Sequence, residues 1–412
     1  MRRKAIHNIA KCKKEWIIYI SITIAMVMLN VLVWNSTAFC DAYIAYIFPL
    51  WVNTYGRLTG LFPFSVGEWM LVAAVILLAA AVVLGIIWTI TALRGYLSRA
   101  EKMTEASIYS SFQKIVKGYY RFMLWLVLGV CVIMTLNCSI LYHATTFSEK
   151  YFGEDTTEYA IEDVVKVYNH VAEKCNELSQ LVERNEDGTI LYRGVNQLGE
   201  PVDMEDKAIE VMQQLGKTYP QLDGYYPRPK PMMFSDFMCQ QYMCGYYFPF
   251  SMEANYNDVM YIMNKPATMC HELAHLRGYI FEDEANFISY LACVQSDDIT
   301  FQYAGYLSVI NYLLNDLYKA YQTSPQMYMA ALIAVEPVTL LPVVQEDKVF
   351  VVQEEWDRIN GKALLDTETV EEMSDTFTDT TLKLNGVSDG MVSYSRVVKL
   401  LLQYYREVEE KK

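Results

Sequence analysis

The sequence predicts a mainly α protein in which three transmembrane helices precede an α+β domain with a small sheet. Three observations predict this fold class. The first 142 residues contain three long apolar runs without internal charge. Later segments repeat apolar residues at helical spacing. Residues 232–263 instead form short stretches rich in Tyr, Phe and Met, which are typical of strands.

The apolar runs are long enough to cross a bilayer. They cover about residues 16–39, 69–93 and 122–142, and a hydrocarbon core of about 30 Å requires roughly 20 residues. A signal peptide would have a shorter apolar core. We therefore expect residues 1–142 to form a multi-pass anchor in contact with lipid of the cell membrane, and residues 143–412 to form a separate domain.

Basic side chains predict the orientation of this anchor. Cytoplasmic flanks of transmembrane helices are enriched in Lys and Arg. The loop between the first two runs contains one basic residue, Arg57, whereas six precede the first run and six lie between the second and third. The latter are Arg94, Arg99, Lys102, Lys114, Lys117 and Arg121. We therefore expect a cytoplasmic N-terminus and an extracytoplasmic domain over residues 143–412.

The charge of the second domain limits its partners. Residues 143–412 contain 21 basic and 43 acidic side chains, a net charge of −22. Such a surface is repelled by phosphate backbones, which argues against nucleic-acid binding. Most of these carboxylates are expected simply to keep the domain soluble.

Apolar periodicity predicts the main helices of this domain. We expect them at residues 156–183, 203–219, 284–294, 299–321, 346–360, 366–384 and 393–407. Four prolines between Tyr219 and residue 231 inclusive predict an extended connector after the second helix. The aromatic residues of segment 36–68 suit either the membrane surface or the underside of the domain, and the sequence does not separate these alternatives.

The motif that carries chemistry runs from His271 to His275 and reads His-Glu-Leu-Ala-His. On a helix, positions four apart are offset by about 40°, so both imidazoles project from one face and can reach one zinc ion. Glu272 then lies beside the first ligand, where it can act as a general base on water. The plainer alternative is an amphipathic helix with two aligned polar residues. Pro266 and Gly278 suit the start and the end of this helix.

The segment Glu282-Asp283-Glu284-Ala285-Asn286 resembles the second helix of the gluzincin metallopeptidases. This resemblance implies that Glu282 is the third zinc ligand, with Glu284 as the alternative. The two differ by about 200° around a helix, so only one can face the metal. Asn286 matches the position of an acidic residue that steadies a histidine ligand, although an amide replaces the carboxylate. A metzincin pattern would require histidine where the chain has Phe281.

The chain also resembles a family of bacterial membrane proteins known only as a domain of unknown function. These proteins have N-terminal membrane helices and an extracytoplasmic domain with an HELAH…EDEANF core. The matching stretches are residues 226–231, 245–250, 253–255, 271–275, 282–287 and 393–398. The resemblance covers most of the chain but implies no substrate.

Together the two resemblances imply a zincin-like domain acting as a membrane-anchored zinc peptidase on peptides or proteins. They imply an edge strand within residues 248–257, where Glu253 and Asn255 either bind substrate termini or cap a turn. The gluzincin resemblance also implies that Tyr303 or Tyr306 donates a hydrogen bond to the oxyanion, whereas their helical spacing alone is typical of core residues. The alternative is a non-catalytic zinc-binding peptide receptor or envelope assembly factor on the same fold.

Overall fold

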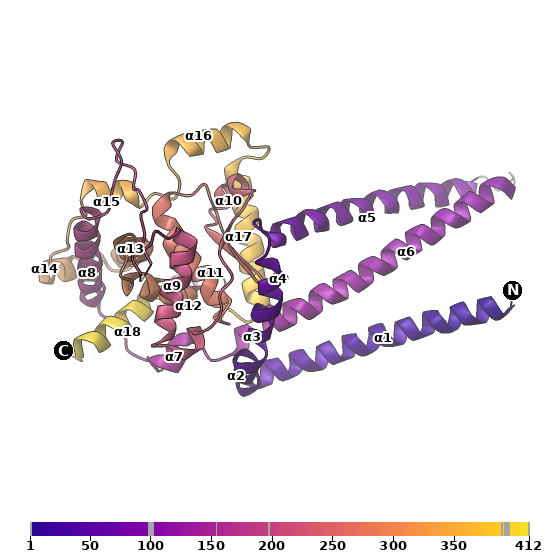
Figure 1. Ribbon diagram of the computed structural model, residues 1–412, viewed down its shortest axis with the longest axis horizontal. Helices are drawn as coiled ribbons and strands as arrows, with labels where there is room; N and C mark the ends of the chain where they lie inside the picture. The colour runs from indigo at the N-terminus through magenta and orange to yellow at the C-terminus, as the bar shows by residue number, and fades with distance from the viewer. Residues whose placement is uncertain are drawn as a thin grey trace.

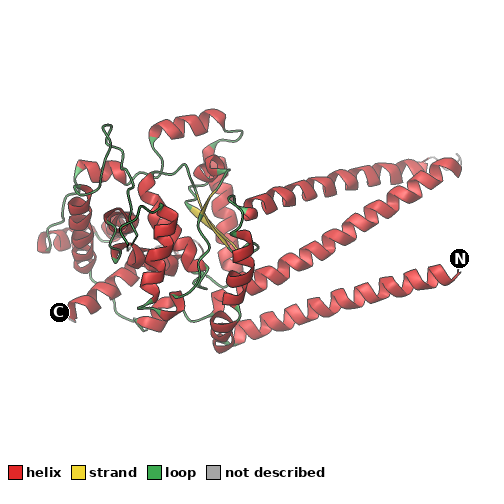
Figure 2. Ribbon diagram, in the orientation of Figure 1, coloured by secondary structure: helices red, strands yellow, loops and turns green. Residues whose placement is uncertain are grey.

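Three long helices project from one side of a mainly helical domain in the computed structural model (Figure 1). The structure describes residues 2–97, 103–153, 155–196, 198–388, 390 and 396–410. Arg99, Lys102 and residues 393–395, which entered the sequence predictions, lie outside the described residues. Figure 2 shows that helices make up most of the fold and that the single small sheet lies within the domain.

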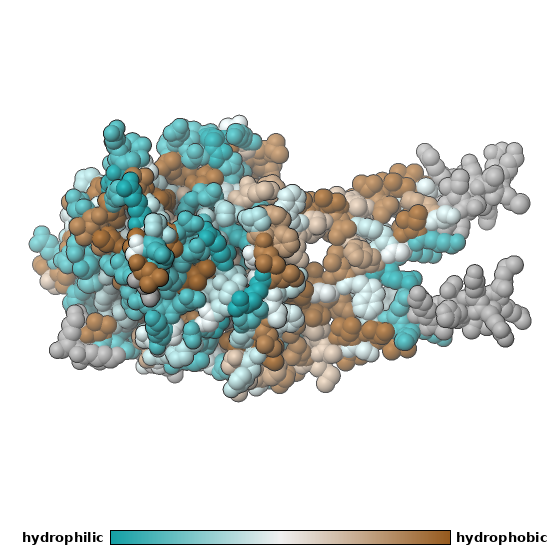
Figure 3. Space-filling model, in the orientation of Figure 1, coloured by the Kyte–Doolittle hydropathy of each residue, from teal (hydrophilic) through white to brown (hydrophobic). Residues whose placement is uncertain are grey.

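The three predicted apolar segments form long helices, each long and apolar enough to cross a membrane. They are α1 (Arg2–Asn35), α5 (Val66–Leu97) and α6 (Met103–Met134), the last extended by turns to His143. Segments long and apolar enough to cross a membrane are Lys13–Asn35, Val66–Leu93 and Ser111–His143. Large apolar side chains along them face outward (Figure 3), which is favourable in hydrocarbon but not in water.

The segment between α1 and α5 packs under the domain, which is one of the two alternatives that its aromatic residues suggested. It contains α2 (Thr37–Tyr46), α3 (Phe48–Trp51), a π-helix at Val52–Gly56 and α4 (Arg57–Thr59). Tyr43 and Phe48 are buried in the main core of the domain, whereas Tyr46 and Leu61 remain exposed. The segment therefore joins the membrane helices to the domain through shared core.

The domain core is formed by helices α8, α9, α11, α12, α13 and α18. The helices after α6 are α7 (Phe147–Tyr151), α8 (Ile161–Ser179), α9 (Met204–Gly216), α10 (Ser235–Gln240), α11 (Lys265–His275), α12 (Glu282–Val294), α13 (Ile299–Thr323), α14 (Pro325–Ala334), α15 (Pro342–Asp347), α16 (Gln353–Lys362), α17 (Thr367–Leu384) and α18 (Val397–Glu410). All seven predicted helices have a counterpart here. The helix predicted at residues 346–360 is split into α15 and α16, and α7, α10 and α14 were not predicted.

The sheet differs from the prediction in which strand forms its edge. It contains β1 (Lys230–Pro231), β2 (Gly245–Phe248) and β3 (Glu253–Tyr256), in the order β1-β3-β2. β3 pairs with β1 in parallel and with β2 in antiparallel orientation. The prediction of an edge strand within residues 248–257 was therefore wrong, because β3 is central and β2 is the edge beside α11. The connector predicted before Pro231 supplies β1, a pairing that local sequence does not encode.

A buried ion pair joins this sheet to the start of α5. The ammonium of Lys230 lies 2.5 Å from a carboxylate oxygen of Glu253, and it also donates to the carbonyls of Thr59 and Phe64. The Glu253 carboxylate accepts from the backbone N–H groups of Val66 and Gly67, at the first turn of α5. A carboxylate there is favoured by the unpaired N–H groups and by the helix dipole.

A side chain of α5 makes a similar contact with the domain. Glu68, in the first turn of α5, accepts hydrogen bonds from the backbone N–H groups of Met233 and Phe234. Near the end of α6, the Asn137 amide donates to the carbonyl of Pro249. The sheet therefore holds α5 and α6 at fixed positions relative to the domain.

We predict that loss of the buried ion pair between the sheet and α5 destabilises the protein. Lys230→Met leaves the Glu253 carboxylate buried without its cation, which should lower the free energy of unfolding by about 3 kcal/mol. The matched control is Arg228→Met on the same connector, which removes an exposed cation from three carboxylates and should cost less than about 1 kcal/mol. Thermal unfolding of both full-length variants in detergent provides the comparison. Equal midpoints for the two variants would contradict the proposed weight of the buried pair.

Candidate metal centre

Helix α11 carries two residues of the centre, His271 and His275, and its sequence explains where the helix starts and stops. Pro266 lies in the first turn, where a missing N–H costs nothing because that group has no partner in the helix. Gly278 has φ +90°, a left-handed conformation that allows the chain to leave the helix. Both features agree with the prediction. His271 and His275 lie one turn apart and face the same side.

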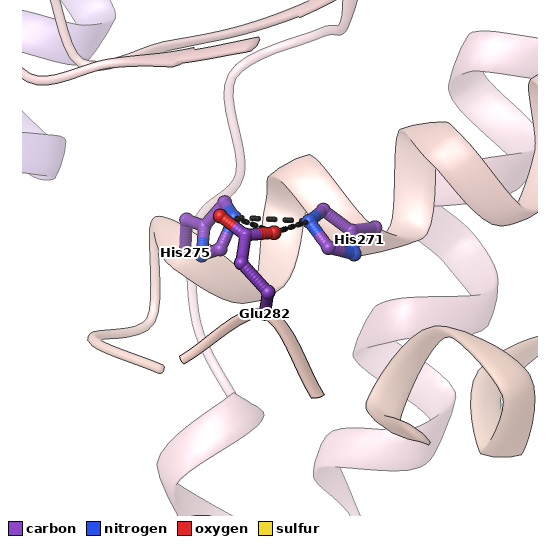
Figure 4. Close-up of side chains that lie close together, drawn as sticks. All are labelled: His271, His275 and Glu282. Atoms are coloured by element: carbon purple, nitrogen blue, oxygen red, sulfur yellow. Dashed lines mark hydrogen bonds and ion pairs between the residues drawn. The ribbon is translucent and has the colours of Figure 1, made fainter. Parts of the chain in front are cut away.

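Helix α12 brings a carboxylate to these imidazoles (Figure 4). Glu282 is the first residue of α12, which packs against α11. One of its oxygens lies 2.9 Å from Nε2 of His271 and 3.9 Å from Nε2 of His275. The two Nε2 atoms are 3.1 Å apart. Tetrahedral zinc ligands at 2.0–2.1 Å are about 3.3 Å from one another, so the three atoms surround a volume of suitable size.

Both imidazoles are oriented by hydrogen bonds on their other nitrogen. Nδ1 of His271 lies 2.9 Å from Oδ1 of Asn286, and Nδ1 of His275 lies 2.7 Å from the carbonyl oxygen of Tyr279. When Nδ1–H donates, the neutral ring presents the lone pair of Nε2 to the cluster, which is the form that binds metal. Asn286 thus contacts the histidine that the resemblance implied.

The structure distinguishes Glu282 from Glu284. Glu284 is buried, and its carboxylate accepts hydrogen bonds from the backbone N–H and the hydroxyl of Ser148, at 3.0 and 2.5 Å. Those contacts tie α12 to α7 and turn the carboxylate away from the imidazoles. Among the described residues, only His271, His275 and Glu282 form a group with metal-ligand spacing.

Glu272 lies beside the cluster in a buried position. A Cβ added to Gly245 would lie 2.5 Å from Oε1 of Glu272, so the glycine makes room for this carboxylate against β2. Its Oε2 has no hydrogen-bond partner within the part of the chain that the structure describes. Burial raises the pKa of Glu272 to about 8, although the positive charge of His271 opposes this shift. The carboxylate is therefore a stronger base than one in water.

The metal-free cluster retains one proton near neutral pH. Burial favours the neutral form of His271, but the hydrogen bond and negative charge of Glu282 outweigh it and raise the pKa of His271 to about 9. Burial and the neighbouring His271 charge lower the pKa of His275 to about 4. The Glu282 carboxylate therefore stabilises one positive charge between the rings, and a divalent cation would take the place of that proton.

The structure does not support the expected role of Tyr303. Its hydroxyl donates to a carboxylate oxygen of Asp347 at 2.8 Å, in a buried network with Arg184. The helical spacing of Tyr303 on α13 reflects its position in the core. The hydroxyl that α13 does bring toward the centre belongs to Tyr312, which accepts from the Asn286 amide at 3.2 Å.

Two further tyrosines border the centre, and the sequence did not single them out. Tyr246 lies on β2, next to Gly245; burial of its hydroxyl and then the charges of Cys138 and Glu272 raise its pKa to about 12. The ring of Tyr142, just after α6, packs edge-on against that of Phe281, with centroids 5.3 Å apart. Their proximity depends on strand pairing and on the position of α6, which periodicity does not encode.

The roles considered for Glu253 and Asn255 are also not supported. Both residues are buried in β3. Glu253 is engaged by Lys230 and by the start of α5, and the Asn255 amide donates to the carbonyl of Tyr246 at 3.2 Å. Both side chains are buried within the sheet, a position that does not suit contact with substrate termini.

Comparison with known proteins identifies a family. Residues 43–402 match the family described as "Protein of unknown function (DUF3810)". The chain belongs to this family. No curated protein and no solved structure matches the chain. The family assignment therefore agrees with the second resemblance noted from the sequence and carries no activity with it.

The second prediction concerns the choice of ligand in this DUF3810 protein. Glu282→Gln removes the anionic ligand and should lower zinc affinity at least about 100-fold, more than loss of an outer hydrogen-bond partner. Glu284→Gln alters only the contact with α7 and should change zinc affinity by less than about threefold. Competition with a zinc-binding dye measures both. Tight binding by the Glu282→Gln variant would exclude Glu282 as a ligand.

Proposed function

We propose that this protein is a membrane-anchored zinc peptidase with a zincin-like domain. The observation that carries the proposal is the convergence of Nε2 of His271, Nε2 of His275 and one Glu282 oxygen, with the Glu272 carboxylate beside them. Catalytic zinc sites have three protein ligands and one open position, and two imidazoles with one carboxylate form such a set. The adjacent glutamate does not bind the metal and remains available for catalysis.

The residues fit zinc in chemistry and in spacing. A carboxylate with two imidazoles suits zinc better than calcium or magnesium, which prefer oxygen ligands. Bound there, zinc would polarise a substrate carbonyl and lower the pKa of water. His271, His275 and Glu282 would hold the ion, while Asn286 and the Tyr279 carbonyl would keep the imidazoles in orientation.

Glu272 would move the proton in this reaction. Its Oε2 has no partner among the described residues, so it is available to accept a hydrogen bond from the attacking water. As a general base it would take the proton of that water, and as a general acid it would deliver the proton to the leaving amine. Its position beside the three candidate ligands supports this role.

We also propose that residues 143–412 lie outside the cytoplasm. The support is the excess of basic residues in the N-terminal part of α1 and in residues 94–121, which include the end of α5 and the beginning of α6. A cysteine introduced by Asp187→Cys, in an exposed turn, should react with an impermeant maleimide on intact cells. Labelling that requires lysis would reverse the proposed topology.

The prediction that decides function concerns Glu272. Glu272→Gln keeps the shape but removes the base, so zinc binding should persist while peptide hydrolysis falls about 100-fold or more. Full-length protein in detergent, a mixed peptide library and mass spectrometry provide the assay. Glu173→Gln, at an exposed position of α8, is the matched control and should retain activity.

Two outcomes would contradict this assignment. A Glu272→Gln variant with wild-type hydrolysis would show that Glu272 is not the base. Zinc-bound wild type without hydrolysis across the library would favour the receptor or assembly role. In that case Glu272→Gln should preserve the cellular phenotype, and His271→Ala, which removes a zinc ligand, should abolish it.

A further inference from the structure

The outer edge of β2 begins at the candidate base. The Asn257 N–H donates to the Cys244 carbonyl, and hydrogen-bonded pairs alternate in an antiparallel ladder. Gly245 and Tyr247 therefore direct their backbone N–H and C=O groups away from β3. Within the described ranges no strand pairs with that edge. Since Gly245 lies against Glu272, an extended peptide paired with β2 would start at the metal centre.

The same strand ends on a membrane helix. A Cβ added to Gly67 would lie 2.5 Å from the ring of Phe248, so the last residue of β2 packs directly on the first turn of α5. Phe248 pairs with Glu253, whose carboxylate binds the N–H groups of Val66 and Gly67. Gly245, which lies against Glu272, and Phe248, which lies on α5, are the two ends of β2. At about 3.3 Å per residue, these two ends are about 10 Å apart.

The length of α5 places this end at the surface of the bilayer. The candidate span Val66–Leu93 has 28 residues, which corresponds to about 42 Å of helix. That length matches the thickness of a bilayer including its headgroups, about 40–45 Å. Gly67, and with it the end of β2, therefore lies in the outer headgroup layer.

A second membrane helix places the metal centre at the same level. The candidate span of α6 continues to His143, so Tyr142 lies at its outer end. The Tyr142 ring packs on Phe281, the residue before Glu282. In addition, the Tyr247 hydroxyl donates to the carbonyl of Asn137 near the end of α6. Two spans thus agree that the ligands lie close to the membrane surface.

From this geometry we propose that the substrate is a membrane-anchored polypeptide, cut within a few residues of the point where it leaves the bilayer. The stretch next to its anchor lies extended along the outer edge of β2, between the headgroups and the Glu272 side chain. A chain held in the same membrane also gains a high effective concentration at this site. This inference rests on the proposed peptidase function and specifies its substrate class.

The experiment uses full-length protein in nanodiscs and mixed-sequence peptides that carry an N-terminal palmitoyl group. In one set, three Gly/Ser residues separate the acyl chain from the variable segment; in the matched set, twenty residues do. Both sets have the same membrane affinity, so only the height of the cleavable segment differs. We expect the short-spacer set to be cut at least tenfold faster, as measured by mass spectrometry. Equal rates, or faster cutting of the long-spacer set, would overturn the inference.

Cleavage of the soluble library but of neither acylated set would overturn the present inference and leave the peptidase function standing. Cleavage of neither the library nor the acylated sets would refute the peptidase function, and a binding measurement would then decide the present inference. The photoreactive substitution Tyr246→p-benzoylphenylalanine places a crosslinker on β2, and the same substitution of Tyr318, exposed on α13, is the control. Crosslinking of the short-spacer peptides at position 246, in at least fivefold excess over the long-spacer peptides and over position 318, would support the membrane-proximal site. Equal yields would refute it.

Discussion

The buried pair of Lys230 and Glu253 is the contact on which the arrangement of membrane and domain depends. Moving two charges out of water is costly, and their mutual attraction alone rarely offsets that cost. Here the ammonium has three acceptors, and the carboxylate also receives two N–H groups from the start of α5. The pair is therefore satisfied only when β1, β3, α4 and α5 are all in place.

This requirement extends to the metal centre through the sheet. β3 carries Glu253 and pairs with β2, and β2 places Gly245 against the Glu272 carboxylate. A shift of α5 would displace the strand that borders the candidate base. The family match, over residues 43–402, likewise includes α5 and α6 together with the domain. Helices α5 and α6 are thus joined through the sheet to the strand that borders the site.

The parts predicted correctly from sequence are those set by short-range spacing. His271, His275, Glu282 and Asn286 fall within sixteen consecutive residues, and helix geometry with one turn between two helices brings them together. The edge strand, the partner of Glu253 and the tyrosines near the site were missed. The Glu253 contact with Val66 joins residues 187 positions apart, and no periodicity encodes such a pairing. Tyr303 was misjudged because the same apolar spacing describes both core and site residues.

Asn286 lies where the resemblance noted from the sequence would place an acidic side chain, and this difference has a physical consequence. Its amide oxygen accepts from His271 while its nitrogen donates to the Tyr312 hydroxyl oxygen. A carboxylate at this position could only accept hydrogen bonds, so the Tyr312 hydroxyl would have to donate its hydrogen to that carboxylate. With the amide, that proton stays available, and burial and the charges of Cys244 and Glu282 raise the pKa of Tyr312 to about 12, so the hydroxyl remains protonated. The amide also adds no negative charge beside Glu282, which leaves that carboxylate as the single anion in contact with the two imidazoles.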